Sequence, residues 1–169
     1  YRVDSVVLDA SGQGSMSIPV LPMDFYRIAL DGEQLIVALD TAEGLTVEAK
    51  SGQLATPSTI SGSVHTEALH TFYSDVRAYD DKRERLRIAM SSGTDTAAIR
   101  SFNALNASFH QQCKEFVNAN ITSPAALTAA GKLNMQKELP LFKAVRDSLR
   151  KTMPRSGFCR VPHPMTVLK

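Results

Sequence analysis

The chain has 169 residues, of which 43% are hydrophobic and 21% are charged, and its formal net charge at pH 7 is +2. This length and composition predict an ordinary globular chain built around one core, and they exclude disorder of the whole. No apolar run approaches the roughly 20 residues of a membrane-spanning helix, so we expect no membrane span. The chain begins at Tyr1 in a strand-like pattern, and we expect that a signal peptide was removed before this residue.

Charge is distributed unevenly along the sequence. From Lys132 to Lys169 there are nine Lys and Arg against two Asp and Glu, a balance of +7 that leaves −5 for the preceding residues. A basic segment binds nucleic acid, an anionic membrane face or an acidic protein, or it is simply the solvated face of a helix. The aromatic residues of a single-strand binder are not interleaved with these cations, so we predict no nucleic-acid partner.

Short strands are predicted over residues 1–64. Their apolar segments are separated by the Gly-bearing turn signals SGQG, DG, TAEG and KSG. This order predicts an antiparallel β-rich unit, arranged as a meander, a sandwich or a partial barrel. The five predicted strands are RVDSVVL, SMSIPVL, FYRIAL, QLIVAL and LTVEA.

Two helices are predicted to pack on this β-rich unit. The first follows Ser63 and carries Leu69, Phe72 and Val76 at helical spacing, over about 12 to 15 residues. The second covers residues 101–121, with two candidate strands before it at 85–90 (RLRIAM) and 97–102 (AAIRSF). The whole pattern predicts an α+β fold, with residues 1–121 as its main domain.

A basic helical segment is predicted over residues 122–153. Ser123 and Pro124 are a typical helix start, and Pro140 is expected to break or kink the segment into a helical hairpin or a kinked helix. Beyond Pro140 an apolar stripe and a set of cations on the other faces are candidates for an interaction surface. The stripe is Leu141, Phe142, Val145 and Leu149, and the cations are Lys143, Arg146, Arg150 and Lys151. Residues 154–169 are predicted to be an extended, Pro-rich tail.

Motifs that carry chemistry are scarce. His65 and His70 are five residues apart, so on a helix their rings point about 140° apart and do not converge on one metal ion. No nucleotide-binding or hydrolase motif is found. We therefore predict no metal site, no cofactor and no catalytic residue.

Cys113 lies on the apolar stripe of the helix at 101–121, which predicts that its sulfur faces the core. A nucleophilic role would need exposure and a basic partner, for which His110, one turn away, is the candidate. A disulfide with Cys159 would close a loop of about 45 residues and stabilise the fold by about 3 to 4 kcal/mol. The alternative is a free buried thiol.

Four segments together resemble the N-terminal domain of the MotY family of sodium-type flagellar motor proteins. They are DFYRIALDGEQLIVALD, GSVHTEALHTFYSDVRA, RLRIAMSS and SFNALNASFHQQCKEFVNANI, within residues 1–121. The early-strand cysteine of that family is absent near Val6 and Val7, which makes Cys159 the more attractive partner for Cys113. Its OmpA-like domain is also absent and a basic helical segment follows instead, so peptidoglycan binding is not carried over.

The resemblance implies a noncatalytic periplasmic subunit that packs into a ring or scaffold of an envelope-spanning machine, such as a flagellar motor. Its partners would be other protein subunits of that assembly. A component of a secretion system is one alternative, and a small soluble binding or inhibitor protein of the immunity type is another. An enzyme that uses Cys113 with His110 is the least favoured hypothesis.

Overall fold

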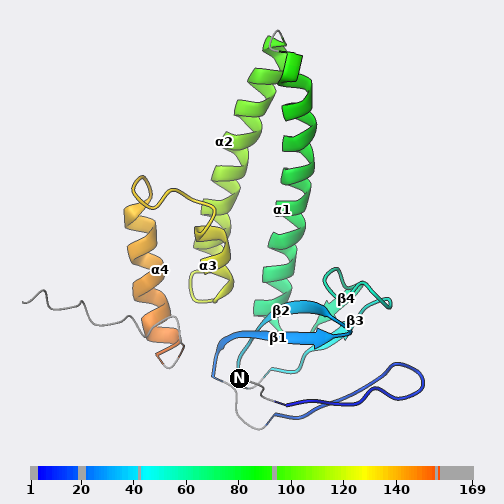
Figure 1. Cartoon of the computed structure of the whole chain (residues 1–169). Helices are drawn as coiled ribbons and strands as arrows, with labels where there is room; N and C mark the ends of the chain where they lie inside the picture. The colour runs from blue at the N-terminus through cyan, green and yellow to red at the C-terminus, as the bar shows by residue number, and fades with distance from the viewer. Residues whose placement is uncertain (1–3, 19–21, 42, 93–94, 155, 157–169) are drawn as a thin grey trace, which may run out of the picture.

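The computed structural model describes residues 4–18, 22–41, 43–92, 95–154 and 156, and it has a mixed α+β fold, as the sequence predicts. Strands come first and helices follow, and the helices account for about half of the described residues (Figure 1). The elements are β1 (Asp24–Leu30), β2 (Glu33–Leu39), β3 (Thr46–Glu48), β4 (Thr59–Ser61), α1 (Val64–Ala89), the 3-10 turn η1 (Met90–Ser92), α2 (Thr96–Ala119), α3 (Ala125–Ala130) and α4 (Leu139–Thr152).

Two small antiparallel sheets form the base of the molecule. β1 and β2 pair along their whole length, from Asp24 opposite Leu39 to Leu30 opposite Glu33. Their turn, Asp31-Gly32, has φ angles of 50° and 83°, the conformation that a two-residue hairpin needs and that Asp-Gly favours. β3 and β4 form a second, shorter hairpin. The hairpin from FYRIAL to QLIVAL is thus confirmed.

The first turn of α1 is joined to the outer edge of β2 by side-chain hydrogen bonds. Thr66 Oγ1 accepts from the Ala38 amide at 3.1 Å and donates to the Ala38 carbonyl at 2.6 Å. Ser63 caps α1 by accepting from the Thr66 amide at 3.2 Å, and its hydroxyl also donates to the Ala38 carbonyl at 3.0 Å. One turn further, His70 Nε2 lies 2.9 Å from the Ile36 carbonyl. The side chain of the cap residue and two side chains of α1 therefore occupy hydrogen-bonding positions at the edge of β2 that a neighbouring strand would otherwise fill.

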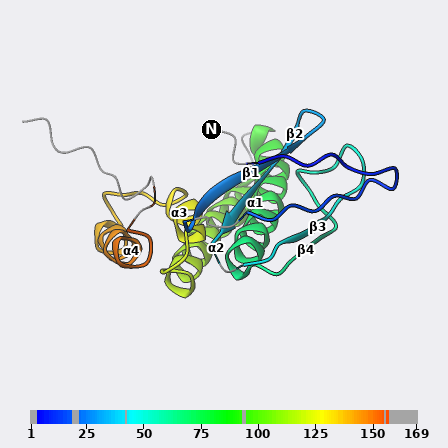
Figure 2. The same ribbon diagram turned by 90° about the horizontal axis from the view of Figure 1, so that it is seen from below.

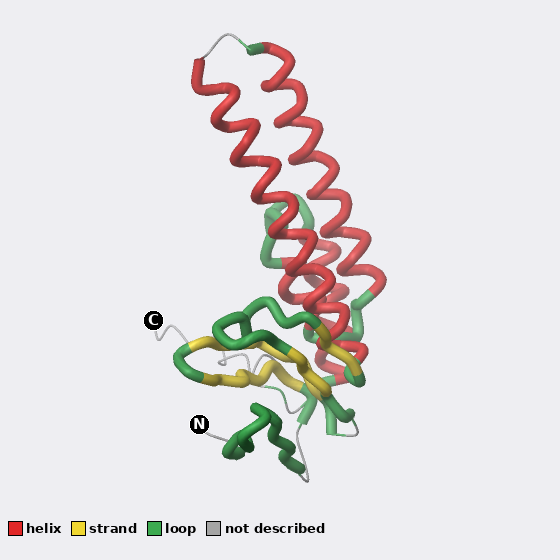
Figure 3. The backbone as a smooth tube through the Cα atoms, turned by 90° about the vertical axis from the view of Figure 1, so that its right-hand side faces the viewer, coloured by secondary structure: helices red, strands yellow, loops and turns green. Residues whose placement is uncertain are grey.

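α1 and α2 form a long antiparallel pair that projects well beyond the sheets (Figures 1 and 3). The strands predicted at 85–90 and 97–102 are wrong, because residues 85–89 end α1, Met90 begins η1, and 97–102 lie at the start of α2. Neither Gly nor Pro interrupts the chain from Ser63 to Ala89, so the capped helix continues. Asp95 then starts α2 by accepting from the Ala97 and Ala98 amides at 3.0 and 2.9 Å.

Aromatic rings fill the lower part of this helix pair. Tyr79 stacks on Phe109 with ring centres 3.8 Å apart, and Phe72 contacts Phe116 at 4.6 Å. The Tyr79 hydroxyl donates to Asn106 at 2.8 Å, so the polar end of this ring is paired. Beyond Tyr79, no residue of α1 is buried. The main core cluster is therefore concentrated at the base, and in the outer part of the pair the buried residue is Ala98 of α2.

α3 brings the chain back against α1 and α2. Ala125 packs with Ala38 of β2 and Leu69 of α1, while Ala126, Ala129 and Ala130 join the main core cluster. Leu133 and parts of α4 belong to the same cluster as Cys113. The hydrophobic core thus runs continuously across residue 121, where the sequence places a domain boundary. Pro140 lies in the first turn of α4, after a non-helical segment at 131–138, so α3 and α4 are separate helices.

Residues 4–18 form an extended, folded-back arm outside the core, called here the N-terminal arm (Figures 1 and 2). The described parts of the predicted strands RVDSVVL and SMSIPVL lie here, and neither is a strand. The physical reason is that no described neighbour offers them a ladder of hydrogen bonds. Residues 2–3 and 19–21 of those predictions lie outside the described residues, as does the tail at 154–169 except Pro154 and Ser156.

We predict that Thr66→Val lowers the free energy of unfolding by about 2 kcal/mol, because the buried Ala38 amide loses its partner. Urea unfolding followed by circular dichroism measures this change. The matched control is Thr71→Val, which removes an exposed hydroxyl from the same helix and should change stability by no more than about 0.5 kcal/mol. Equal effects of the two substitutions would contradict a special role for the bond to β2.

Candidate interaction surface on the C-terminal helix

Sequence features at both ends of α4 explain where this helix begins and ends. Before it, the Asn134 side chain accepts from the Gln136 and Lys137 amides at 3.0 and 3.1 Å, which forms the turn into the helix. Pro140 in the first turn costs no hydrogen bond, because amides there have no partner within the helix. Arg150 and Lys151 in the last turn interact favourably with the negative end of the helix dipole. The cations at this end therefore also stabilise the helix that carries them.

The predicted apolar stripe of α4 faces the chain's own core. Val145 and Leu149 are each 3% exposed and belong to the main core cluster. Leu141 and Phe142 are half-buried and pack against the same cluster. The stripe is thus occupied within the chain, and the interaction candidates that remain accessible are the cations.

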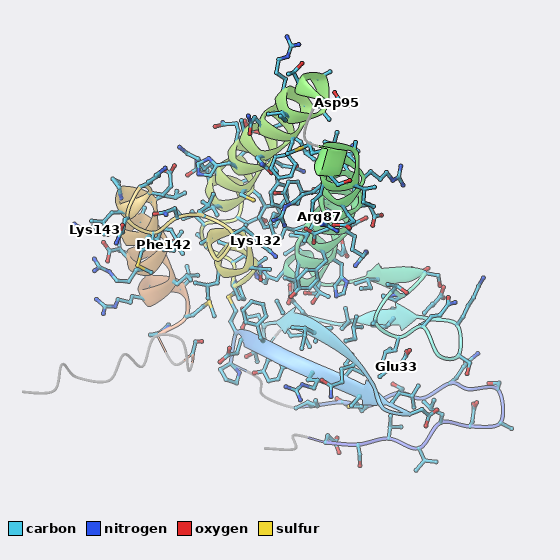
Figure 4. All side chains as sticks on the ribbon, turned by 45° about the horizontal axis from the view of Figure 1, so that its top comes forward. Glu33, Arg87, Asp95, Lys132, Phe142 and Lys143 are labelled. Atoms are coloured by element: carbon cyan, nitrogen blue, oxygen red, sulfur yellow. The ribbon has the colours of Figure 1, made fainter. Side chains whose placement is uncertain are left out.

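Those cations lie on the exposed side of α4. Lys143, Arg146, Arg150 and Lys151 are all exposed, and Figure 4 shows Lys143 on the side of α4 that faces away from the other helices. Arg146 pairs with its neighbour Asp147 at 2.8 Å. Within the described residues, no ion pair joins the other three to a carboxylate. The outer face of α4 therefore presents unneutralised positive charge.

A cluster of charges on α2 and before α4 fixes the start of α4. Glu138, whose side chain is 16% exposed, lies 3.1 Å from Lys114 Nζ and 3.4 Å from His110 Nε2. Both partners come from α2, 24 and 28 residues earlier in the chain. Sequence reasoning missed this cluster, since no local pattern relates residues so far apart. It orients α4 so that the stripe meets the core and the cations face outward.

Cys113 is a buried thiol at the centre of the main cluster. Its residue surface is 0% exposed. Burial raises the pKa of Cys113 to about 11, and the charge of Lys132 opposes this only in part. His110, its candidate activating base, instead lies against Glu138. Cys113 is thus a neutral, inaccessible thiol at pH 7. Cys159 lies outside the described residues, so the disulfide with Cys113 stays a prediction.

One open groove of about 430 Å³ lies between the first half of α1 and the β3–β4 hairpin. His70, Ser74 and Arg77 of α1 line one side of it, and Thr56, Pro57 and Ile60 line the other. Desolvation lowers the pKa of His70, and Arg77 acts in the same direction, while the bond to Ile36 opposes them. Among the described residues, no buried side-chain polar atom lacks a partner.

Comparison with known proteins finds no matching family model, no similar curated protein and no similar solved structure. None of the described helices combines the length and the apolar character that crossing a membrane requires. No group of three or more possible metal-ligating side chains is found in the described part of the chain.

We expect Leu149→Ala to lower the free energy of unfolding by about 2 to 4 kcal/mol, because it leaves a cavity where α4 meets the core. The measurement is chemical unfolding of the full chain. Leu139→Ala, on the same helix at a residue that is 46% exposed, is the matched control and should cost much less. A small effect of Leu149→Ala would mean that α4 is not part of the folding unit.

The Cys113 thiol should make stability fall as the pH rises above 9. The thiol of the unfolded chain, with an ordinary pKa of 9.0, loses its proton there, while the folded thiol keeps it up to about pH 11. Its contribution is fully present below pH 9 and declines by at most about 2 to 3 kcal/mol between these pH values. Unfolding curves of the wild type and of Cys113→Ala across this pH range separate the contribution of the Cys113 thiol from that of the Lys and Tyr side chains. Parallel pH profiles of the two proteins would refute it.

Proposed function

We propose that this chain is a noncatalytic structural subunit of a bacterial envelope-spanning assembly, located in the periplasm and bound to other protein subunits through the outer face of α4. The observation that carries the proposal is the division of α4 into two faces. Its apolar stripe is occupied by the chain's own core, and Lys143, Arg146, Arg150 and Lys151 remain exposed. A helix packed in this way presents its charges on its outer side to a partner.

The chemistry of the surface indicates an acidic protein partner. Arg and Lys form charge-assisted hydrogen bonds with carboxylates, and complementary charge raises the rate and the specificity of association. Arg150 and Lys151 stabilise the last turn of α4, but exposed charges otherwise contribute little to folding, so stability gives no reason for the cations at Lys143 and Arg146. The type of envelope machine, a flagellar motor ring or scaffold, is taken from the resemblance to the MotY family.

Replacing the four α4 cations by Gln should remove the chain from its assembly while leaving it folded. Gln keeps a high helix propensity and removes four positive charges without adding negative ones. The measurement is co-fractionation of the tagged full-length chain with a high-mass envelope complex in native gels of the host cell. We expect strong loss of co-fractionation, and a melting temperature that changes by only a few degrees.

A matched control is available on α1. Lys82, Arg83, Arg85 and Arg87 are also exposed cations on a helix, and their replacement by Gln removes the same charge. This control should co-fractionate as the wild type does. If the α4 variant still enters the complex, or if the wild type is found in no envelope complex at all, the proposed function is wrong.

A further inference from the structure

The groove between α1 and the β3–β4 hairpin lies beside the joint where β4 passes into α1. Gly62 forms this joint with a φ of 96°, a conformation that glycine adopts readily, and a Cβ there would overlap the Gly44 carbonyl oxygen. The Glu67 carboxylate in the first turn of α1 accepts from the Gly62 amide at 2.8 Å. The two walls of the groove are therefore joined by the chain's own contacts, without a ligand.

Opposite charges mark the two ends of the helical wall. Glu67 and Arg77 both line the groove, and ten residues of α1 separate them by about 15 Å along the helix axis. His70 and Ser74 lie between them at spacings of three and four residues, so one face of α1 carries the whole set. Among the described residues, no carboxylate pairs with Arg77. The groove thus has an acidic end and a basic end.

Between these charges the groove offers hydrogen-bonding groups on one wall and apolar surface on the other. In the described part of the chain the Ser74 hydroxyl has no hydrogen-bond partner, so it is available to donate and to accept. His70 Nε2 donates to the Ile36 carbonyl, and desolvation lowers the pKa of the ring, so at pH 7 Nδ1 is an acceptor. Pro57 and Ile60 supply apolar surface on the opposite wall.

We propose that this groove binds a short extended peptide of about four residues with free ends, with its carboxylate at Arg77 and its amino group at Glu67. Four extended residues span about 13 to 14 Å, close to the separation of the two charges, whereas a single amino acid does not reach both. Peptide N–H and C=O groups match the hydrogen-bonding wall, and apolar side chains match the other.

The size of the groove agrees with a ligand of this class. Its volume of about 430 Å³ lies within the range of about 300 to 1,000 Å³ that is usual for small-molecule sites. Both charged ends are open to solvent, so each ion pair should contribute modestly and the affinity should be moderate. The site is separate from the outer face of α4, and the inference does not depend on the proposed function.

Isothermal titration calorimetry of the full-length chain with the peptide Ala-Leu-Leu-Ala tests the proposal. Because side chains alternate along an extended peptide, one of the two leucines faces the apolar wall whichever side is turned inward. We expect saturable binding of one peptide per chain. Acetylation of the amino end and amidation of the carboxyl end should each weaken binding about two- to fivefold, because each removes one exposed ion pair.

Two substitutions assign the two ends. Arg77→Gln should bind the amidated and the free peptide equally and still prefer a free amino end. Glu67→Gln should show the opposite pattern, and its amide oxygen still accepts from the Gly62 amide, which preserves the joint. Arg85→Gln removes an exposed cation of α1 that does not line the groove, so this matched control should bind as the wild type does. Circular dichroism checks that each variant is folded.

Three results would overturn the proposal. The first is a wild type that does not bind the free peptide at concentrations up to about 10 mM. The second is a wild type for which blocking either end has no effect. The third is a folded Arg77→Gln or Glu67→Gln variant that keeps the preference for the end assigned to the replaced residue.

Discussion

The attachment of α1 to the outer edge of β2 is the interaction on which the rest of the structure depends. Ser63 and Thr66 satisfy the first turn of the helix and the backbone of Ala38 at the same time. The cap fixes where α1 begins, and the bonds to β2 fix its position against the sheet. Because the aromatic core forms between α1 and α2, the placement of α3 and α4 follows from this contact.

Short sequence patterns predicted the elements whose structure depends only on residues close together in the chain. The hairpin at Asp31-Gly32 was found because a two-residue turn and its alternating flanks lie within 16 residues. The error at 85–90 has a different cause. Leu86, Ile88 and Met90 alternate as in a strand, but Leu86 and Met90 are also one helical turn apart and both are half-buried, while Ile88 is 59% exposed. A segment of six residues does not distinguish the two-residue period of a strand from the 3.6-residue period of a helix. The cap at Ser63 starts a helix that continues to Ala89, so this segment is helical.

The candidate surface on α4 could likewise be predicted from the sequence only in part. The stripe at Val145 and Leu149 and the core position of Cys113 follow from helical periodicity, and both are confirmed. The pairing of Glu138 with Lys114 and His110 depends on how α2 and α4 meet in space, which no spacing in the sequence encodes.

The buried alanines of α3 determine how closely this helix packs against the elements it contacts. Ala125, Ala126, Ala129 and Ala130 are at most 3% exposed, so the most buried contacts of α3 are made by methyl groups. A longer side chain at these positions has no free volume to enter, and tightly packed interiors shift when they are overfilled. Since α4 packs on the same cluster, such a shift would move its charges without altering any of them. The direction in which α4 presents its cations therefore depends on these alanines as well as on the contacts of Glu138 with Lys114 and His110.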